Sequence, residues 1–151
     1  MDRANVSVLP PVIPVVGLSL GFVLQGLFPL SLGAPTVTAV LGGAVLCVSV
    51  ALVLAASWEL TRAQTAFDVR RTTTRLVRSG VFSWSRNPVY LAMVLLCWAI
   101  GLLADIPWVL LLAVPTASLL CLIVIRREER YLGRKFGDAY RAYCGDVRRW
   151  I

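Results

Sequence analysis

The sequence contains no histidine among its 151 residues. Histidine is a usual ligand of haem iron and zinc, and its side chain titrates closest to neutral pH. Its absence excludes His-dependent catalytic triads and a histidine general base. Any acid–base or ligand chemistry in this chain must use other side chains.

Cysteine is also scarce, and the four cysteines include no C-x-x-C pair. Cys47, Cys97 and Cys121 fall inside apolar segments, and Cys144 lies near the C-terminus. Isolated cysteines in apolar surroundings usually behave as small hydrophobic residues. We therefore predict neither a disulfide framework nor a metal site.

The sequence also lacks the G-x-G-x-x-G turn. Dinucleotide-binding folds place this turn between a strand and a helix, where it holds phosphates on the helix N-terminus. If this chain binds a nucleoside-containing cofactor, helices and loop backbone must hold it instead.

Apolar residues, in contrast, are abundant: 58% of the chain is hydrophobic and the mean hydropathy is +0.78. A membrane-spanning helix needs about 20 mostly apolar residues. We predict an all-α, single-domain polytopic membrane protein with four transmembrane helices, at about 10–30, 36–58, 88–104 and 107–125. The short connections predict that the first two helices form one antiparallel hairpin and the last two another. We expect the first segment to be retained rather than cleaved as a signal peptide.

The 15 basic residues lie on one side of these predicted spans. They occur before the first span, in the loop 59–87 and in the tail 126–151, whereas Asp105 is the single charge in the two opposite connections. The positive-inside rule then predicts that both termini and the loop are cytoplasmic. The net charge of +7 indicates membrane orientation and attraction to anionic lipids, and we predict no nucleic-acid partner.

Small residues recur one helical turn apart in the first two spans, at Gly17 and Gly21 and at Ala39 and Gly43. Such pairs let helix backbones approach closely in a membrane. We predict that both pairs lie at helix–helix contacts.

The tail 126–151 has apolar residues at three- or four-residue spacing with basic residues between them. This pattern predicts a basic amphipathic helix, or a pair of helices, lying on the membrane. Glu128 and Glu129 depart from the pattern. They either pair with neighbouring arginines in a continuous helix or bind a ligand that carries positive charge or sugar hydroxyls.

Four separated motifs stand in the C-terminal half: T-x-L-V-x-x-G-V-F from Thr74, R-N-P-x-Y from Arg86, E-E-x-x-L from Glu128, and F-G-x-x-Y-x-x-Y from Phe136. In this order and spacing, residues 72–151 resemble the isoprenylcysteine carboxyl methyltransferase and phospholipid methyltransferase family of integral membrane enzymes. The first two spans share only a hydropathy pattern with that family.

The resemblance implies an enzyme that binds S-adenosyl-L-methionine at the cytoplasmic membrane face and methylates a lipophilic acceptor from the bilayer. It implies catalytic roles for Arg86, facing a carboxylate, and for Glu128, facing ribose hydroxyls or an ammonium group. It implies a substrate-binding role for Arg127. The implied cofactor-binding residues are Thr74, Arg75, Leu76, Val77, Gly80, Phe82, Asn87, Pro88, Val89, Tyr90 and Glu128.

Two positions depart from the family pattern. The family often has histidine where this chain has Asn87, whose amide can donate and accept hydrogen bonds but cannot titrate. The eukaryotic prenylcysteine enzymes have a substrate-binding arginine where this chain has Val124, so Arg126 or Arg127 is left to replace it. A prenylated cysteine, a phospholipid amine, an isoprenoid acid and a small thiol all remain possible acceptors, and the oligomeric state is open.

Two other interpretations compete with a methyltransferase. Sterol reductases share a similar C-terminal arrangement, which makes an NADPH-dependent reductase conceivable, although this chain is short for so large and anionic a cofactor. A non-catalytic four-helix membrane subunit is the second alternative. No charge lies in the middle of a predicted span, as an ion path would usually require.

Overall fold

The computed structural model describes residues 9–64 and 75–151, and within these ranges it contains helices and connections but no strand. The all-α prediction is therefore confirmed for the described residues. The elements are, in order, α1 (Val12–Leu27), α2 (Pro35–Arg62), the 3₁₀ turn η1 (Gly80–Ser83), α3 (Pro88–Leu103), α4 (Pro107–Leu119), the π-helical segment η2 (Leu120–Ile125), α5 (Arg126–Phe136) and α6 (Asp138–Asp146).

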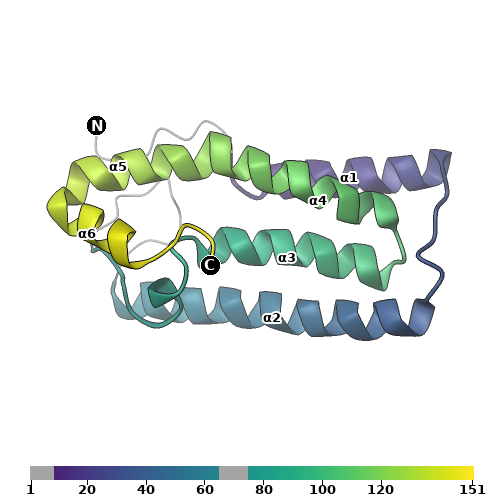
Figure 1. The fold of residues 1–151 in the computed structure, drawn as a ribbon, viewed down its shortest axis with the longest axis horizontal. Coiled ribbons are helices and arrows are strands. Elements are labelled where there is room, and N and C mark those ends of the chain that lie inside the picture. The colour runs from purple at the N-terminus through teal and green to yellow at the C-terminus, as the bar shows by residue number, and fades with distance from the viewer. Residues whose placement is uncertain (1–8, 65–74) are drawn as a thin grey trace.

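The four apolar helices lie side by side in an elongated bundle, with α5 and α6 at one end (Figure 1). α3 packs against both α2 and α4, whereas α1 packs mainly against α4. The predicted hairpin of α3 and α4 is confirmed. The predicted hairpin of the first two helices is wrong, because residues 28–34 carry the chain from the α4 side of the bundle to the α3 side.

Small residues on α1 explain its contact with α4. A Cβ atom added to Gly17 would lie 2.4 Å from the Thr116 hydroxyl, and one added to Gly21 would lie 2.6 Å from a Val109 methyl group. Real carbon atoms do not approach so closely, so both positions require glycine at this packing distance. The prediction for this pair is confirmed.

On α2 the predicted small-residue contact is displaced by one position. A Cβ atom on Gly42 would lie 2.8 Å from Leu103 of α3, whereas nothing lies within 4 Å of one on Gly43. Further along the same face, the Ser49 hydroxyl donates a hydrogen bond of 2.8 Å to the Ala92 carbonyl of α3. The prediction for Gly43 is wrong because the helical register turns Gly42 toward α3.

Two of the helices in the described residues are long and apolar enough to cross a membrane: α2, and the continuous helix Pro107–Phe136 formed by α4, η2 and α5. α1 and α3 are apolar but have only 16 residues each. Two helix boundaries also differ from the sequence prediction. α2 continues to Arg62, inside the predicted loop, and the fourth helix does not end at residue 125, because α5 continues it.

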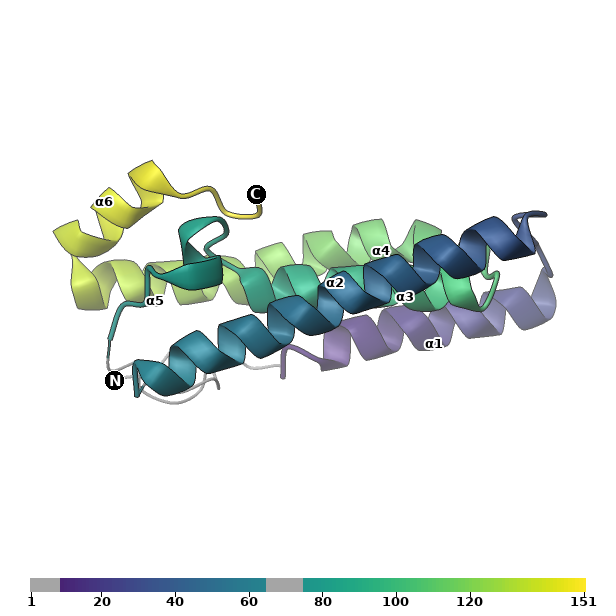
Figure 2. The same cartoon turned by 90° about the horizontal axis from the view of Figure 1, so that it is seen from below.

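The tail forms a pair of helices, as one of the two sequence alternatives proposed. Gly137 has a positive φ of 54°, which lets the chain reverse between α5 and α6. In Figure 2, α6 turns back beside α5, and the segment that follows it runs past η1 to the C-terminus. Tyr140 and Tyr143 are buried in a cluster with Val147, against which Leu76 packs. This reversal returns the C-terminus toward the start of α3.

Candidate active site

The first turns of α3 and α5 meet at a hydrogen bond between Tyr90 and Glu128. α3 begins with Pro88 at its first position, where a proline loses no helical hydrogen bond. This start places Tyr90 in the first turn, and its hydroxyl donates to a Glu128 carboxylate oxygen at 2.9 Å. Tyr90 is buried, with 5% of its surface exposed. Two residues that the family resemblance assigns to the cofactor site are thus in direct contact.

The environment of Glu128 favours its protonated form. This residue lies in the polar continuation of the helix, beyond the apolar segment that ends at Ile125. Burial raises the pKa of Glu128 to about 7, the hydrogen bond from Tyr90 lowers it, and the neighbouring charge of Glu129 raises it. A carboxylate with a pKa near neutrality is typical of a functional site.

Glu129 has a different role, because two arginines from distant parts of the sequence share its carboxylate. Arg149 donates two hydrogen bonds to it, from Nε at 2.9 Å and from Nη2 at 2.8 Å. An Nη2 atom of Arg86 lies 3.5 Å from the same carboxylate. Arginine pairing, the simpler of the two sequence alternatives, therefore applies to Glu129. The arginines come from the start of α3 and the C-terminus, not from the neighbouring turns of α5.

One donor in this cluster has no acceptor. The Nε–H group of Arg86 is buried, and no described residue accepts a hydrogen bond from it. A buried guanidinium N–H without a partner is energetically costly. Two guanidinium groups also face the single carboxylate of Glu129. The excess positive charge and the vacant donor suit an anionic group of a ligand.

The C-terminal segment contacts the residues just before α3. The Asn87 side-chain amide donates to the Arg149 carbonyl at 3.0 Å, and the backbone N–H of Arg86 donates to the Arg148 carbonyl at 3.1 Å. The Ser85 hydroxyl also points to the Arg149 carbonyl, at 3.5 Å. Asn87 is thus held by protein backbone in this structure.

The segment before α3 packs against α6. The Tyr143 hydroxyl donates to the Phe82 carbonyl at 2.6 Å, and burial raises the pKa of Tyr143 to about 12, so the group stays protonated as a donor. Arg78 donates to the Ala139 carbonyl, and its guanidinium lies 5.7 Å from the Tyr143 ring centre. Phe82 therefore contributes its carbonyl to the fold around the site.

Not all of the remaining predicted site residues lie in the cluster around Tyr90, Glu128 and Glu129. Pro88 is fully buried, whereas Val77 and Val89 are partly exposed and Arg75 is exposed. Arg127 lies in the first turn of α5 and is partly exposed. Thr74 lies outside the described residues. The roles predicted for Arg75, Val77, Val89 and Arg127 remain predictions.

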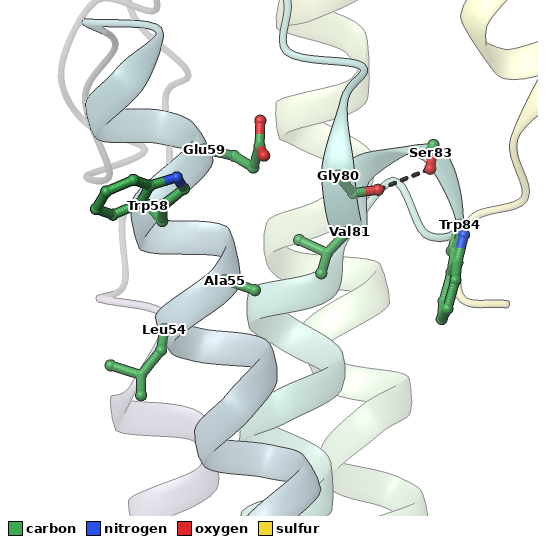
Figure 3. A pocket seen from close by; sticks show the side chains of 8 residues that line it. All are labelled: Leu54, Ala55, Trp58, Glu59, Gly80, Val81, Ser83 and Trp84. Carbon is green, nitrogen blue, oxygen red and sulfur yellow. Dashed lines mark hydrogen bonds between the residues drawn. The ribbon is translucent and has the colours of Figure 1, made fainter.

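Gly80 lies at an open groove of about 680 Å³ between α2 and η1 (Figure 3). Its positive φ of 57° and missing Cβ allow Glu59 to approach, because an added Cβ would lie 2.6 Å from the Glu59 carboxylate. Ser79 donates to that carboxylate. Trp58 and Trp84, which are 70% and 79% exposed, also line this groove. The apolar groove therefore has a carboxylate within it.

The sequence analysis did not select Arg149, Ser85, Tyr143 or Glu59. Arg149 follows another arginine near the C-terminus, and nothing in the surrounding sequence distinguishes it from an ordinary surface arginine. Glu59 was detectable as an acid at the end of a long apolar run, but its contact with η1 depends on the fold. Among the described residues, no group of three His, Cys, Asp or Glu side chains could hold a metal ion.

Comparison with known proteins shows which family this chain belongs to. The family model described as phospholipid methyltransferase matches residues 37–139, which run from the first turn of α2 through η1, α3, α4, η2 and α5. An uncharacterized protein of Haemophilus influenzae is 37% identical over 66 residues, covering 40% of this chain and 94% of that protein. Because the family model matches more than half of the chain, this protein belongs to the phospholipid methyltransferase family, a membership that suggests methyl transfer.

Proposed function

We propose that this protein is an S-adenosyl-L-methionine-dependent methyltransferase that acts on a lipophilic acceptor at the cytoplasmic face of a membrane. Family membership supports methyl transfer. The observation that carries the choice of cofactor is the buried Nε–H of Arg86, which has no acceptor among the described residues, in a guanidinium whose Nη2 lies 3.5 Å from the Glu129 carboxylate. Glu128, which accepts a hydrogen bond from Tyr90, provides an acidic group next to Glu129 in the first turn of α5.

The residues present fit the charges of this cofactor. Arg86 would hold its carboxylate through the vacant N–H group, and Glu128 would hold the ammonium group or the ribose hydroxyls. Tyr90 orients the Glu128 carboxylate by donating to one of its oxygens. When bound, the cofactor supplies a methyl group already activated on a sulfonium sulfur. The protein then has chiefly to orient the reactants and exclude water.

The groove beside η1 supports a lipophilic acceptor. Leu54, Ala55 and Val81 line it together with the exposed Trp58 and Trp84 rings. Tryptophan at a membrane boundary presents an apolar ring and a polar N–H group, which suits the interfacial region. An acceptor with a hydrocarbon chain would lie along this groove with its polar end toward the loop before α3.

We also propose a multi-pass topology with both termini in the cytoplasm. Two helices satisfy the length of a membrane span, and two shorter apolar helices pack beside them. η1, α5 and α6 lie at one end of the bundle, where the described basic residues concentrate (Figure 1). The excess of basic residues at this end supports a cytoplasmic location for the site.

Binding measurements on the detergent-solubilised full chain test the cofactor. Titration calorimetry with S-adenosylhomocysteine should give saturable binding, and the same titration with NADPH should give none. Binding of NADPH alone would support a reductase, and binding of neither would support a non-catalytic protein. Mass spectrometry of membrane lipids incubated with the protein and isotopically labelled cofactor should then reveal a methylated lipophilic product and its reacting group.

A further inference from the structure

We propose that Arg149 is a positioning residue for the cofactor site, and this inference rests on the proposed function. It fastens the C-terminal strap, residues 147–151, across the entrance of α3. In this position the strap holds Asn87 in place and keeps the Arg86 guanidinium available to a ligand.

The strap crosses the entrance through its backbone. The carbonyls of Arg148 and Arg149 accept hydrogen bonds from the Arg86 N–H at 3.1 Å and from the Asn87 amide at 3.0 Å. The Ser85 hydroxyl lies 3.5 Å from the second of these carbonyls. Three consecutive residues before α3 are thus tied to two consecutive residues of the strap. Any displacement of the strap would release the side chain of Asn87.

The side chain of Arg149 fastens the strap to α5. Its guanidinium meets both oxygens of Glu129, at 2.9 and 2.8 Å, and its Nη1 lies 3.9 Å from the Cys121 sulfur. A planar fork of donors suits such a two-point contact, whereas a lysine ammonium offers a single point of charge. The Glu129 side chain is 16% exposed and that of Arg149 is 37% exposed, so solvent reaches the pair from the Arg149 side and weakens it only in part.

Apolar contacts on both sides of Arg149 indicate that the strap has one defined path. Val147 is buried with Tyr140 and Tyr143, and Trp150 packs against the core cluster that contains Tyr90. The strap therefore joins the α6 cluster to the cluster beneath the first turn of α3. Arg149 lies between these two anchors.

Arg149 also affects which groups remain available to a ligand. It meets both Glu129 oxygens at short distances, whereas Arg86 is 3.5 Å from that carboxylate and keeps a buried Nε–H without an acceptor. Without Arg149, the carboxylate would attract the Arg86 guanidinium more strongly. The group that we assign to the cofactor carboxylate would then be turned toward Glu129.

A matched pair of variants tests the proposal. Arg149→Leu and Arg148→Leu remove the same charge from adjacent positions, but Arg148 is exposed and supplies its backbone carbonyl, which the substitution keeps. At a temperature below the melting transitions, we expect Arg149→Leu to weaken S-adenosylhomocysteine binding about tenfold or more, and Arg148→Leu less than about twofold. Arg149→Lys should retain more affinity than Arg149→Leu, because lysine keeps the positive charge but cannot donate to both Glu129 oxygens in the geometry of a guanidinium. Equal weakening by the two leucine variants would overturn the proposal.

Trp150 gives a readout that needs no cofactor. The emission of Trp150, obtained by subtracting the spectrum of a matching Trp150→Phe protein, should shift to the red in Arg149→Leu as the strap loosens. A red shift with parental affinity would overturn the positioning role and leave the proposed function intact. Should Arg149→Leu fail to fold, parental affinity in Arg149→Lys would overturn the role equally well. Absence of binding in the parent protein would overturn both proposals.

Discussion

The Tyr90 hydroxyl donates a 2.9 Å hydrogen bond to Glu128 and thereby joins the first turn of α3 to the first turn of α5, across 38 positions of the sequence. Both residues belong to motifs that the sequence places on separate helices. Their contact makes the first turn of α3 part of a polar site rather than an ordinary membrane boundary.

Replacement of Tyr90 by phenylalanine should weaken S-adenosylhomocysteine binding about tenfold, or roughly 1 to 2 kcal/mol. The substitution removes the hydrogen bond that lowers the pKa of Glu128, so less of the carboxylate is ionised near neutral pH. Ser49→Ala is the control, because it removes a buried interhelical hydroxyl that bonds the Ala92 carbonyl of α3 and does not take part in the Tyr90–Glu128 contact. We expect Ser49→Ala to lower the melting temperature and keep parental affinity. Equal affinities in Tyr90→Phe and the parent would show that Tyr90 has no role in binding.

Replacement of the two adjacent glutamates by glutamine should have different consequences. Measured at pH 8, Glu128→Gln should weaken cofactor binding about ten- to a hundredfold, because it removes a charge-assisted contact of about 1.5 to 3 kcal/mol. Glu129→Gln should instead lower the unfolding free energy by about 1 to 2 kcal/mol, because it breaks the fork with Arg149.

Calorimetry and thermal unfolding of both glutamine variants separate these effects. Glu129→Gln is also expected to weaken binding indirectly, by loosening the strap, but by less than Glu128→Gln. A larger loss of affinity in Glu129→Gln would reassign the ligand contact to that residue.

The stability of the protein should fall as pH rises through the range set by Glu128. Its folded pKa of about 7 exceeds the ordinary value of 4.5, so between these pH values the folded state keeps a proton that the unfolded state releases. The contribution of Glu128 to stability is therefore most favourable below pH 4.5, declines by up to about 3 kcal/mol toward pH 7, and is constant above. The unfolding free energies of the parent protein and of Glu128→Gln should be measured between about pH 4 and about pH 8. The parent value minus the Glu128→Gln value should decline between pH 4.5 and pH 7 and be constant above. A flat difference would contradict the raised pKa.

Cysteine labelling should place residues 32 and 145 on opposite sides of the membrane. Leu32 lies in the connection between α1 and α2, and Gly145 is exposed with no atom within 4 Å of an added Cβ. In a background without the four native cysteines, a membrane-impermeant thiol reagent applied to intact cells should label Leu32→Cys and leave Gly145→Cys unlabelled until the cells are opened. Labelling of both in intact cells would exclude the proposed topology.

Several features of the fold followed from local sequence alone. The apolar segments were long enough to be identified, and Pro88 and Pro107 marked helix starts that the structure retains, because proline fits the first position of a helix. Spacing in the tail predicted amphipathic helices, and Gly137 is where the pair separates. The order of the family motifs also pointed to Asn87, Tyr90 and Glu128.

The sequence by itself determined where the apolar helices and the polar tail lie, because length, hydropathy and proline position act locally. Tertiary structure decided which of them meet. It paired α1 with α4, selected Gly42 over Gly43 as the close contact of α2, and brought Arg149 to Glu129. These outcomes depend on helix register and on the reversal at Gly137, which carries the C-terminus back to α3. The spacing of residues along the chain does not predict such contacts, because the residues involved are far apart in the sequence and meet only when the helices pack together.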